Sequence, residues 1–246
     1  MYTTHDTEFR RYALYVMAPP DLHAMASAWL GWDSVTGVAV PHLQPEGLLD
    51  TPEKITATPR KYGFHATIKP PFRLAKGETQ SSLDAVCKRV LAALPPVEIK
   101  LAVKSFKGFV AMVPAQPSAA LEKLAADVVE QLDGLRAPLN AAELERRRKS
   151  GLTDRQEALL AKWGYPGVME EFQFHMTLSG KLDAAHADQL AAVLSKTFAD
   201  VIPNPFRIDT MGLLGEDKMG RFHFIQSYTL TGKPYAVADV ALGASV

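Results

Sequence analysis

Two short segments of the chain carry the same residue pattern, Phe64-His65-Ala66-Thr67-Ile68 and Phe174-His175-Met176-Thr177-Leu178. Side chains in a strand alternate between two faces, so each segment would bury its apolar residues and present one His and one Thr together. Two such pairs meeting across a phosphate ester would supply a base for water and an acid for the leaving alkoxide. The hydroxyls would donate to the non-bridging oxygens. We therefore predict His65 and His175 as an acid–base pair, with Thr67 and Thr177 as phosphate ligands.

The order of elements around the two segments indicates a duplication. Each segment is followed by a predicted helix, a proline break and two predicted strands. Val97 follows His65 by 32 residues and Phe206 follows His175 by 31, so the downstream strands begin at nearly the same distance. Two repeats can pack about an approximate two-fold axis, which would bring the H-x-T segments face to face. A single H-x-T is a weak signal, and two unrelated half-buried strand histidines are the alternative.

Apolar periodicity and the Pro and Gly breaks predict the remaining elements. Strands are predicted at 11–18, 64–69, 97–106, 108–113, 172–179, 206–214 and 221–230, and helices at 21–32, 80–94, 118–132 and 184–198, with an irregular loop at 37–60. Residues 140–163 are charged and helix-prone, and the run Arg146-Arg147-Arg148-Lys149 within them is most simply a solvated helix face. We expect one bilobal domain over 1–246, with a first lobe at about 11–115, a helical insertion at about 116–166 and a second lobe at about 167–235.

The composition of the chain indicates which kinds of partner and which cellular location to expect. Lys plus Arg and Asp plus Glu are both 27, a zero balance that argues against an extended nucleic-acid footprint. Cys87 is the single cysteine, so no disulfide can form within the chain, as expected in a reducing cytoplasm. The first residues do not resemble a signal peptide and no stretch is apolar enough for a membrane span, so we expect a cytoplasmic protein without a membrane partner.

No metal or other cofactor is expected. The seven histidines form no H-x-x-x-H or H-E-x-x-H pattern, and the one cysteine cannot contribute a cluster. A metal site assembled from residues far apart in sequence is the alternative.

Further residues are candidates for substrate binding because of their place beside the two segments. Lys69 is predicted to share the face of His65 and to bind a second phosphate, while Arg60 and Tyr62 precede the same strand as a loop edge. Tyr12 and Arg221 lie on flanking predicted strands, at positions from which the alternation of side chains could direct them into the site. An exposed lysine, a core tyrosine and ordinary strand residues are the alternatives.

The segments Arg60–Phe72, Trp163–Pro166 and Phe174–Leu178 resemble the 2H phosphoesterase superfamily, in particular a branch associated with bacterial phosphonate metabolism. The resemblance covers about residues 11–230. It implies an α+β, bilobal duplication in which two antiparallel sheets line a central cleft, with helices outside. It also implies a metal-independent cyclic phosphodiesterase, a phosphoric diester hydrolase, in which His65 and His175 are catalytic and Thr67 and Thr177 bind the phosphate.

For this branch the resemblance implies a small-molecule substrate, a phosphoribosyl 1,2-cyclic phosphate formed in phosphonate breakdown. An RNA end carrying a 2′,3′-cyclic phosphate is the alternative substrate, and a long basic groove with aromatic side chains would favour it. A non-catalytic phosphate- or nucleotide-binding module is a third interpretation, against which the two intact histidines count. The sequence does not assign the acid and the base between them.

Overall fold

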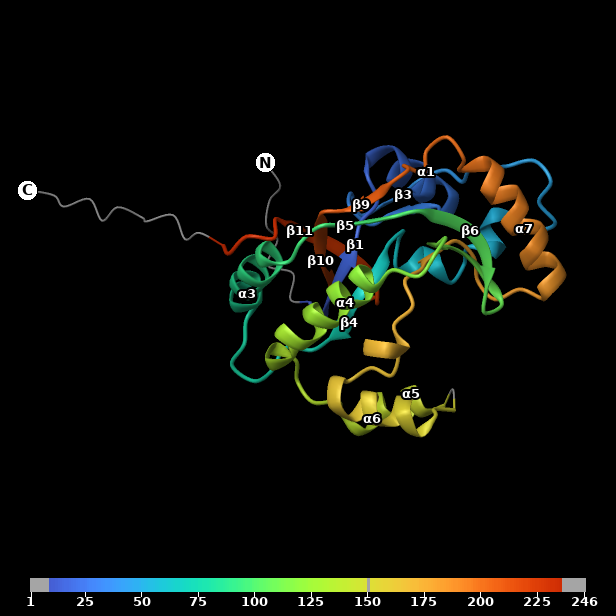
Figure 1. Cartoon of the computed structure of the whole chain (residues 1–246). Helices are drawn as coiled ribbons and strands as arrows, with labels where there is room; N and C mark the ends of the chain where they lie inside the picture. The colour runs from blue at the N-terminus through green and yellow to red at the C-terminus, as the bar shows by residue number, and fades with distance from the viewer. Residues whose placement is uncertain (1–8, 150, 236–246) are drawn as a thin grey trace, which may run out of the picture.

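An antiparallel sheet of seven strands, ordered β11-β10-β1-β4-β8-β7-β6, organises the chain (Figure 1). The computed structural model describes residues 9–149 and 151–235. The strands of this sheet are β1 (Arg11–Val16), β4 (Ala66–Phe72), β6 (Leu101–Phe106), β7 (Phe109–Pro114), β8 (Met176–Thr177), β10 (Thr210–Glu216) and β11 (Phe222–Thr229). Two short ribbons pair β2 (Trp32–Asp33) with β3 (Val38–Ala39) and β5 (Val97–Ile99) with β9 (Phe206–Ile208).

The α+β class and the antiparallel pairing predicted from the sequence are confirmed. The two expected sheets are the halves of one continuous sheet, joined where β4 meets β8 through the pair Ala66–Met176. Equivalent segments of the two repeats also pair with each other in β5 and β9, where Val97 lies opposite Ile208. Antiparallel pairing of equivalent strands at both places agrees with an approximate two-fold relation between the repeats.

The lobe boundaries expected at 11–115 and 167–235 do not coincide with the pairing of the strands. Strand β7 comes from the first repeat but pairs with β8 of the second, and β10 of the second repeat pairs with β1. The halves therefore exchange strands. Sequence order alone could not show this, because strand partners are fixed by long-range packing.

Helices pack around the sheet, and most of them contribute to its main hydrophobic cluster. They are α1 (Pro20–Leu30), α2 (Pro52–Ile55), α3 (Gln80–Ala93), α4 (Ala119–Gln131), α5 (Ala141–Arg148), α6 (Asp154–Trp163) and α7 (Ala184–Thr197). The cluster joins Leu14 and Val16 of β1 to buried residues of α1, α3, α4 and α7, including Trp29 and Leu190. The opposite face of β1 carries Ala13 and Tyr15, which form a separate small cluster with Leu214 and Phe222. None of the helices in the described part of the chain is long and apolar enough to cross a bilayer.

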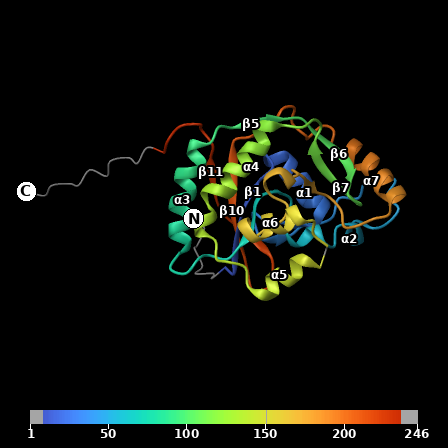
Figure 2. The same cartoon turned by 60° about the horizontal axis from the view of Figure 1, so that its bottom comes forward.

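The insertion predicted at about 116–166 includes α4, which packs in the main hydrophobic cluster, and a helical pair, α5 and α6, which lie next to each other in both views (Figures 1 and 2). Each helix begins with a capping box, at Asn140 for α5 and at Thr153 for α6, which satisfies backbone donors at the helix start. An ion pair between Arg148 and Glu157 links the two helices. Leu159 packs with Val129 at the end of α4, so the pair is anchored to the body of the protein.

Several expected elements have different bounds. The strand predicted at 172–179 forms ladder pairs only at Met176–Thr177. Strand β4 continues through Pro70 and Pro71, which were predicted to end it, because Phe72 still pairs with Tyr12 beyond an irregularity in the ladder. The loop predicted at 37–60 contains the short helix α2.

Candidate active site

Pairing of β4 with β8 brings the two H-x-T segments onto adjacent strands. Ala66 lies opposite Met176. Continuing this antiparallel register by one residue on each side sets His65 opposite Thr177 and Thr67 opposite His175. Opposed side chains on one face have Cβ atoms about 4.5–5.5 Å apart, and diagonal neighbours about 7–8 Å apart. On this extended register the two histidines would be diagonal neighbours, and the charge of His175 does act on the pKa of His65.

Both imidazoles are held in the same way by backbone carbonyls. His65 Nδ1 lies 3.0 Å from the oxygen of Gly63, and His175 Nδ1 lies 2.7 Å from the oxygen of Gln173. A carbonyl oxygen only accepts, so Nδ1 carries the hydrogen in each ring and the neutral form leaves Nε2 with its lone pair. In His65, Nε2 lies 3.2 Å from Thr67 Oγ1, whose hydroxyl can donate to it. The reactive nitrogen of each ring is therefore Nε2.

Burial sets the protonation of both rings. It lowers the pKa of His65 to about 4; the hydrogen bond to Gly63 opposes this shift, and the charge of His175 adds to it. Burial also lowers the pKa of His175, again against its backbone hydrogen bond, and the charge of Lys107 contributes in the same direction. Without a bound anion both rings are set toward the neutral form, His65 the more strongly.

Tyr15 is a site residue that the sequence interpretation missed. Its ring stacks on the imidazole of His65 with centroids 3.7 Å apart and planes at 17°. Tyr15 is 1% exposed and contacts Phe222, which in turn contacts the predicted site residue Tyr62. The alternation of side chains along β1 could have indicated Tyr15, because Tyr12 and Tyr15 must lie on opposite faces of the strand.

The surroundings of His175 come from the hairpin between β6 and β7. Its ring lies 5.5 Å from that of Phe106 and 5.7 Å from that of Phe109. The two-residue turn has positive φ at both Lys107 and Gly108, the pattern of a tight type I′ hairpin. This turn fixes the two phenylalanine rings beside His175.

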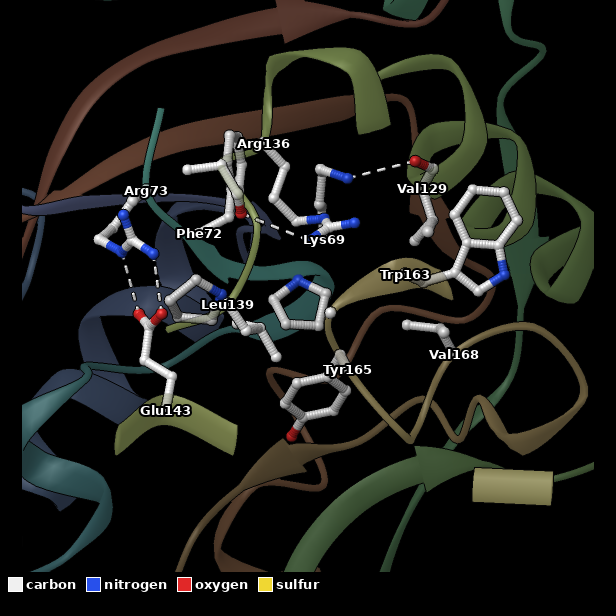
Figure 3. Close-up of a pocket in the computed structure, with 14 residues that line it drawn as sticks. Lys69, Phe72, Arg73, Val129, Arg136, Leu139, Glu143, Trp163, Tyr165 and Val168 are labelled. Atoms are coloured by element: carbon white, nitrogen blue, oxygen red, sulfur yellow. Dashed lines mark hydrogen bonds and ion pairs between the residues drawn. The ribbon is translucent and has the colours of Figure 1, made fainter. Parts of the chain in front are cut away.

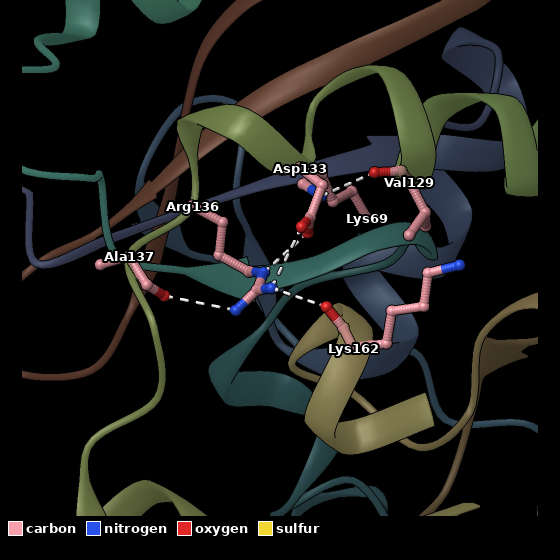
Figure 4. Close-up of polar contacts among 6 residues, drawn as sticks. All are labelled: Lys69, Val129, Asp133, Arg136, Ala137 and Lys162. Carbon is pink, nitrogen blue, oxygen red and sulfur yellow. Dashed lines mark hydrogen bonds and ion pairs between the residues drawn. The ribbon is translucent and has the colours of Figure 1, made fainter. Parts of the chain in front are cut away.

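The prediction that Lys69 shares the face of His65 is wrong. Along β4 the register with β1 shifts, so that Thr67 pairs with Tyr15 while Lys69 pairs with Leu14 of the opposite face. This bulge reverses the alternation after Thr67. Lys69 is 2% exposed, and its ammonium donates to the oxygen of Val129 at 3.2 Å and lies 3.8 Å from Asp133 (Figure 4).

Arg60 and Tyr12 also lie away from the histidines. Arg60 donates to the oxygens of Leu30 and Glu53, so its guanidinium joins the loop before β4 to the end of α1. Tyr12 belongs to the main hydrophobic cluster, and its hydroxyl lies 3.3 Å from Gln80 Oε1. Both predictions of substrate binding are corrected to structural roles, because backbone carbonyls and core packing occupy these side chains.

Arg221 lies on the other side of its strand from the site. Its guanidinium stacks on Trp32, 4.4 Å from the ring centroid, and the neighbouring Phe222 takes the place beside Tyr15. The expected alternation is present, but it turns Phe222 rather than Arg221 toward the histidines. His223 is bonded to Asp217 at 2.7 Å, which agrees with an ordinary strand histidine.

Two pockets adjoin these elements. One lies where the insertion meets β4, among Lys69, Arg73, Glu143, Trp163 and Tyr165 (Figure 3), and its volume of about 20 Å³ suffices for about one water molecule. The other is an open pocket of about 310 Å³ that includes Phe106 and Gln173. The ring of Phe106 contacts the ring of His175, and the backbone oxygen of Gln173 accepts a hydrogen bond from its Nδ1. The larger pocket therefore borders the candidate site.

Within residues 9–149 and 151–235, no group of three or more His, Cys, Asp or Glu side chains is placed to hold a metal ion. Cys87 is buried, and burial raises the pKa of its thiol to about 12, so it is not a reactive thiolate near neutral pH. The expectation of a metal-independent site remains a prediction for experiment.

A family model described as "Protein of unknown function (DUF1045)" matches residues 67–223. The chain belongs to this family. The matched region includes Thr67 and the whole second H-x-T segment, and it begins just after His65.

Curated relatives carry a name connected with phosphorylated ribose. The chain is 36% identical over 223 residues to "Ribose 1,5-bisphosphate phosphokinase PhnN" of Janthinobacterium sp. (strain Marseille), covering 85% of this chain and 48% of the relative. It is 30% identical over 212 residues to the protein of the same name from Laribacter hongkongensis (strain HLHK9), covering 85% of this chain and 49% of the relative. The chain spans about half the length of the curated relatives it matches.

Among solved structures, one described as "Crystal structure of phosphoesterase" is similar over 91% of this chain and 99% of its own, with 15% sequence identity and a TM-score of 0.44.

Proposed function

We propose that this protein is a metal-independent phosphodiesterase that opens a small cyclic phosphate ester by acid–base catalysis with His65 and His175. The observation that supports the proposal is the pairing of Ala66 with Met176 between β4 and β8, together with the backbone bonds that hold Nδ1 of both rings and leave each Nε2 available. This set contains a base, an acid and neutral donors, the groups that hydrolysis of a diester needs.

The reaction balances with water as the co-substrate. One neutral Nε2 accepts a proton from water as its oxygen attacks phosphorus. The other ring, protonated at Nε2, gives its proton to the leaving alkoxide as the P–O bond of the ring breaks, and the product is a monoester. A bound anion favours the imidazolium form and offsets the effect of burial on one ring. Their titrations are then coupled through the phosphate.

A phosphorylated ribose is the proposed organic part of the substrate, as a phosphoribosyl 1,2-cyclic phosphate. The name of the curated relatives refers to a ribose bisphosphate, and the resemblance to the phosphonate branch points to the same chemistry. The kinase activity in that name belongs to proteins about twice as long, so it is not transferred to this chain.

An RNA end with a 2′,3′-cyclic phosphate is the second candidate, and the pocket beside His175 favours it. Phe106 and Phe172 line this pocket, whose volume of about 310 Å³ is within the range of small-ligand sites. Aromatic side chains stack on bases of any sequence. The two candidate substrates therefore differ in the group that would lie next to His175, which is a polar sugar phosphate in one and a nucleobase in the other.

Phosphorus NMR with both substrates tests the proposal. The wild-type protein should convert phosphoribosyl 1,2-cyclic phosphate to a monoester faster than it converts a short RNA ending in a 2′,3′-cyclic phosphate. His65→Ala and His175→Ala should each lose about 10²- to 10⁴-fold in kcat, the usual range for a lost acid or base. His223→Ala is the matched control, because His223 is also half-buried on a strand but is bonded to Asp217. Full activity in both single variants would refute the mechanism, and faster turnover of the RNA would favour the second candidate.

A further inference from the structure

The turn that leads into β4 carries the carbonyl that holds His65. Gly63 lies two residues before His65, and its backbone oxygen is 3.0 Å from Nδ1 of the imidazole. The φ of Gly63 is 72°, in the left-handed region that glycine adopts without strain. In the second repeat the equivalent carbonyl belongs to Gln173, an exposed residue with a side chain. The two imidazoles are therefore held by backbone positions with different requirements.

Ser34 packs directly against Gly63. A Cβ on Gly63 would lie 2.5 Å from Oγ and 2.6 Å from Cβ of Ser34, so only a hydrogen fits in this direction. Ser34 is 1% exposed, and its Oγ has no hydrogen-bond partner within residues 9–149 and 151–235. A buried hydroxyl without a partner is unfavourable, so hydrogen bonding does not explain a serine at this place. The close contact with Gly63 does explain a small side chain there.

The hairpin of β2 and β3 fixes the position of Ser34. The backbone oxygen of Ser34 accepts a hydrogen bond from the N–H of Phe224 in β11 at 3.1 Å. The preceding residue, Asp33, accepts at Oδ1 from the N–H of Val35 at 2.8 Å, which closes the turn, and this oxygen lies 2.9 Å from Nε2 of His23 on α1. Ser34 is therefore tied to the edge strand of the sheet and, through Asp33, to α1.

Arg60 holds the start of the Gly63 turn. Its backbone oxygen accepts from the N–H of Gly63 at 3.4 Å, and its guanidinium donates to the oxygens of Leu30 at 3.0 Å and Glu53 at 2.7 Å. The turn is thus anchored to the end of α1 by Arg60 and covered by Ser34. Because a close-packed interior transmits displacements, a shift of either contact would move the Gly63 carbonyl.

We propose that Ser34 is a positioning residue for His65. Its buried side chain sets the place of the Gly63 carbonyl, which keeps the hydrogen of the neutral imidazole on Nδ1 and leaves Nε2 with its lone pair. The inference rests on the proposed function for the task of Nε2, and it deepens that function by naming a residue that acts through the shape of a turn. Ser34 acts by the size of its side chain, so its hydroxyl is dispensable.

Nitrogen-15 NMR of the imidazoles tests this inference without any substrate. Ser34→Val, which places a larger side chain against Gly63, should move both nitrogen signals of neutral His65 toward the other tautomer. It should also lower kcat about 10- to 100-fold, the effect of a misplaced catalytic group. The signals of His175 should stay unchanged, because a different carbonyl holds that ring. Ser34→Ala, which keeps Cβ and removes only the hydroxyl, should match the wild type in tautomer and within about two-fold in kcat.

Substitutions at Gly63 give a reciprocal test. Gly63→Ala should displace the carbonyl and change the His65 signals in the same direction. Adding Ser34→Gly removes the atoms 2.5 Å and 2.6 Å away, so the double variant should recover part of the wild-type pattern. Gly77→Ala is the matched control, because Gly77 has a φ of 90° but no atom within 4 Å of an added Cβ. It carries the strain of a left-handed alanine without the contact, so its His65 signals and kcat should match the wild type.

Wild-type His65 signals in folded Ser34→Val would overturn the inference, and so would a double variant without recovery. Equal changes at His65 and His175 would also overturn it, because they would report a general loss of structure. If Ser34→Val does not fold, the Gly63 variants decide in the same way. If the wild type hydrolyses neither cyclic ester, the proposed function is refuted, whereas the His65 signals still decide whether Ser34 positions the ring.

Discussion

Replacement of Tyr15 tests how the fold controls the protonation of His65. The ring of Tyr15 covers one face of the imidazole at 3.7 Å, and burial lowers the pKa of His65 from 6.5 to about 4. That difference corresponds to about 3 kcal/mol favouring the neutral ring. In Tyr15→Ala one face of the imidazole is opened to water, so a substantial part of the burial effect should be lost. We expect the pKa of His65 to rise by about one pH unit or more.

The same variant should be less stable by about 3–5 kcal/mol, the usual cost of truncating a buried aromatic ring. Tyr15→Phe is the control that separates the ring from the hydroxyl, because it keeps the stack and the volume. Its His65 should titrate as in the wild type.

Histidine NMR titration gives the pKa directly, and chemical unfolding followed by tryptophan fluorescence gives the free energy of unfolding. An unchanged His65 pKa in folded Tyr15→Ala would refute the role of the stack. An equal rise in Tyr15→Phe would assign the effect to the hydroxyl instead.

Three further predictions follow from the same geometry. Because the pKa of His65 is about 4 when folded and 6.5 when unfolded, the unfolded chain binds more protons between these values, so stability should fall by up to about 3 kcal/mol as the pH decreases through this window. Melting temperatures across this range should depend less on pH in His65→Gln, and an unchanged slope would contradict the assignment. Lys69→Met should keep kcat/KM within about two-fold, because Lys69 points away from the histidines; a loss of more than about 10-fold would place it back in the site. Turnover measured after dialysis against a chelator should be unchanged, and loss of activity restored by added metal would show a metal-dependent reaction.

The sequence predicted the features that depend on local pattern. Alternation within Phe174–Leu178 and its counterpart placed His and Thr on one face, and the spacing of the repeats indicated that equivalent strands would meet. The helices at α3, α4 and α7 were found from apolar periodicity, and each has bounds within one residue of the prediction. These features arise from forces between neighbours in sequence or from a strict period, so a single sequence contains them.

Features that depend on long-range pairing were not predicted correctly. The bulge in β4 exists because of its register with β1, and it reverses the side on which Lys69 lies. The contact of Tyr15 with His65 requires β1 to lie next to β4, whereas the predicted site residue Tyr12 faces the core. Arg60 was selected for its place at the loop edge before β4, but backbone carbonyls of α1 and α2 bind it. In each case the deciding partner is distant in sequence.

The proposed mechanism requires two imidazoles to contact one small anion. The direct test is a titration with inorganic phosphate, followed by long-range ¹H–¹⁵N NMR of the histidine side chains. The Nε2 signals of His65 and His175 should shift together and saturate at the same phosphate concentration, while His223 stays unchanged because it is bonded to Asp217. A shift of only one of the two catalytic signals, or saturation at two different concentrations, would contradict a shared phosphate site.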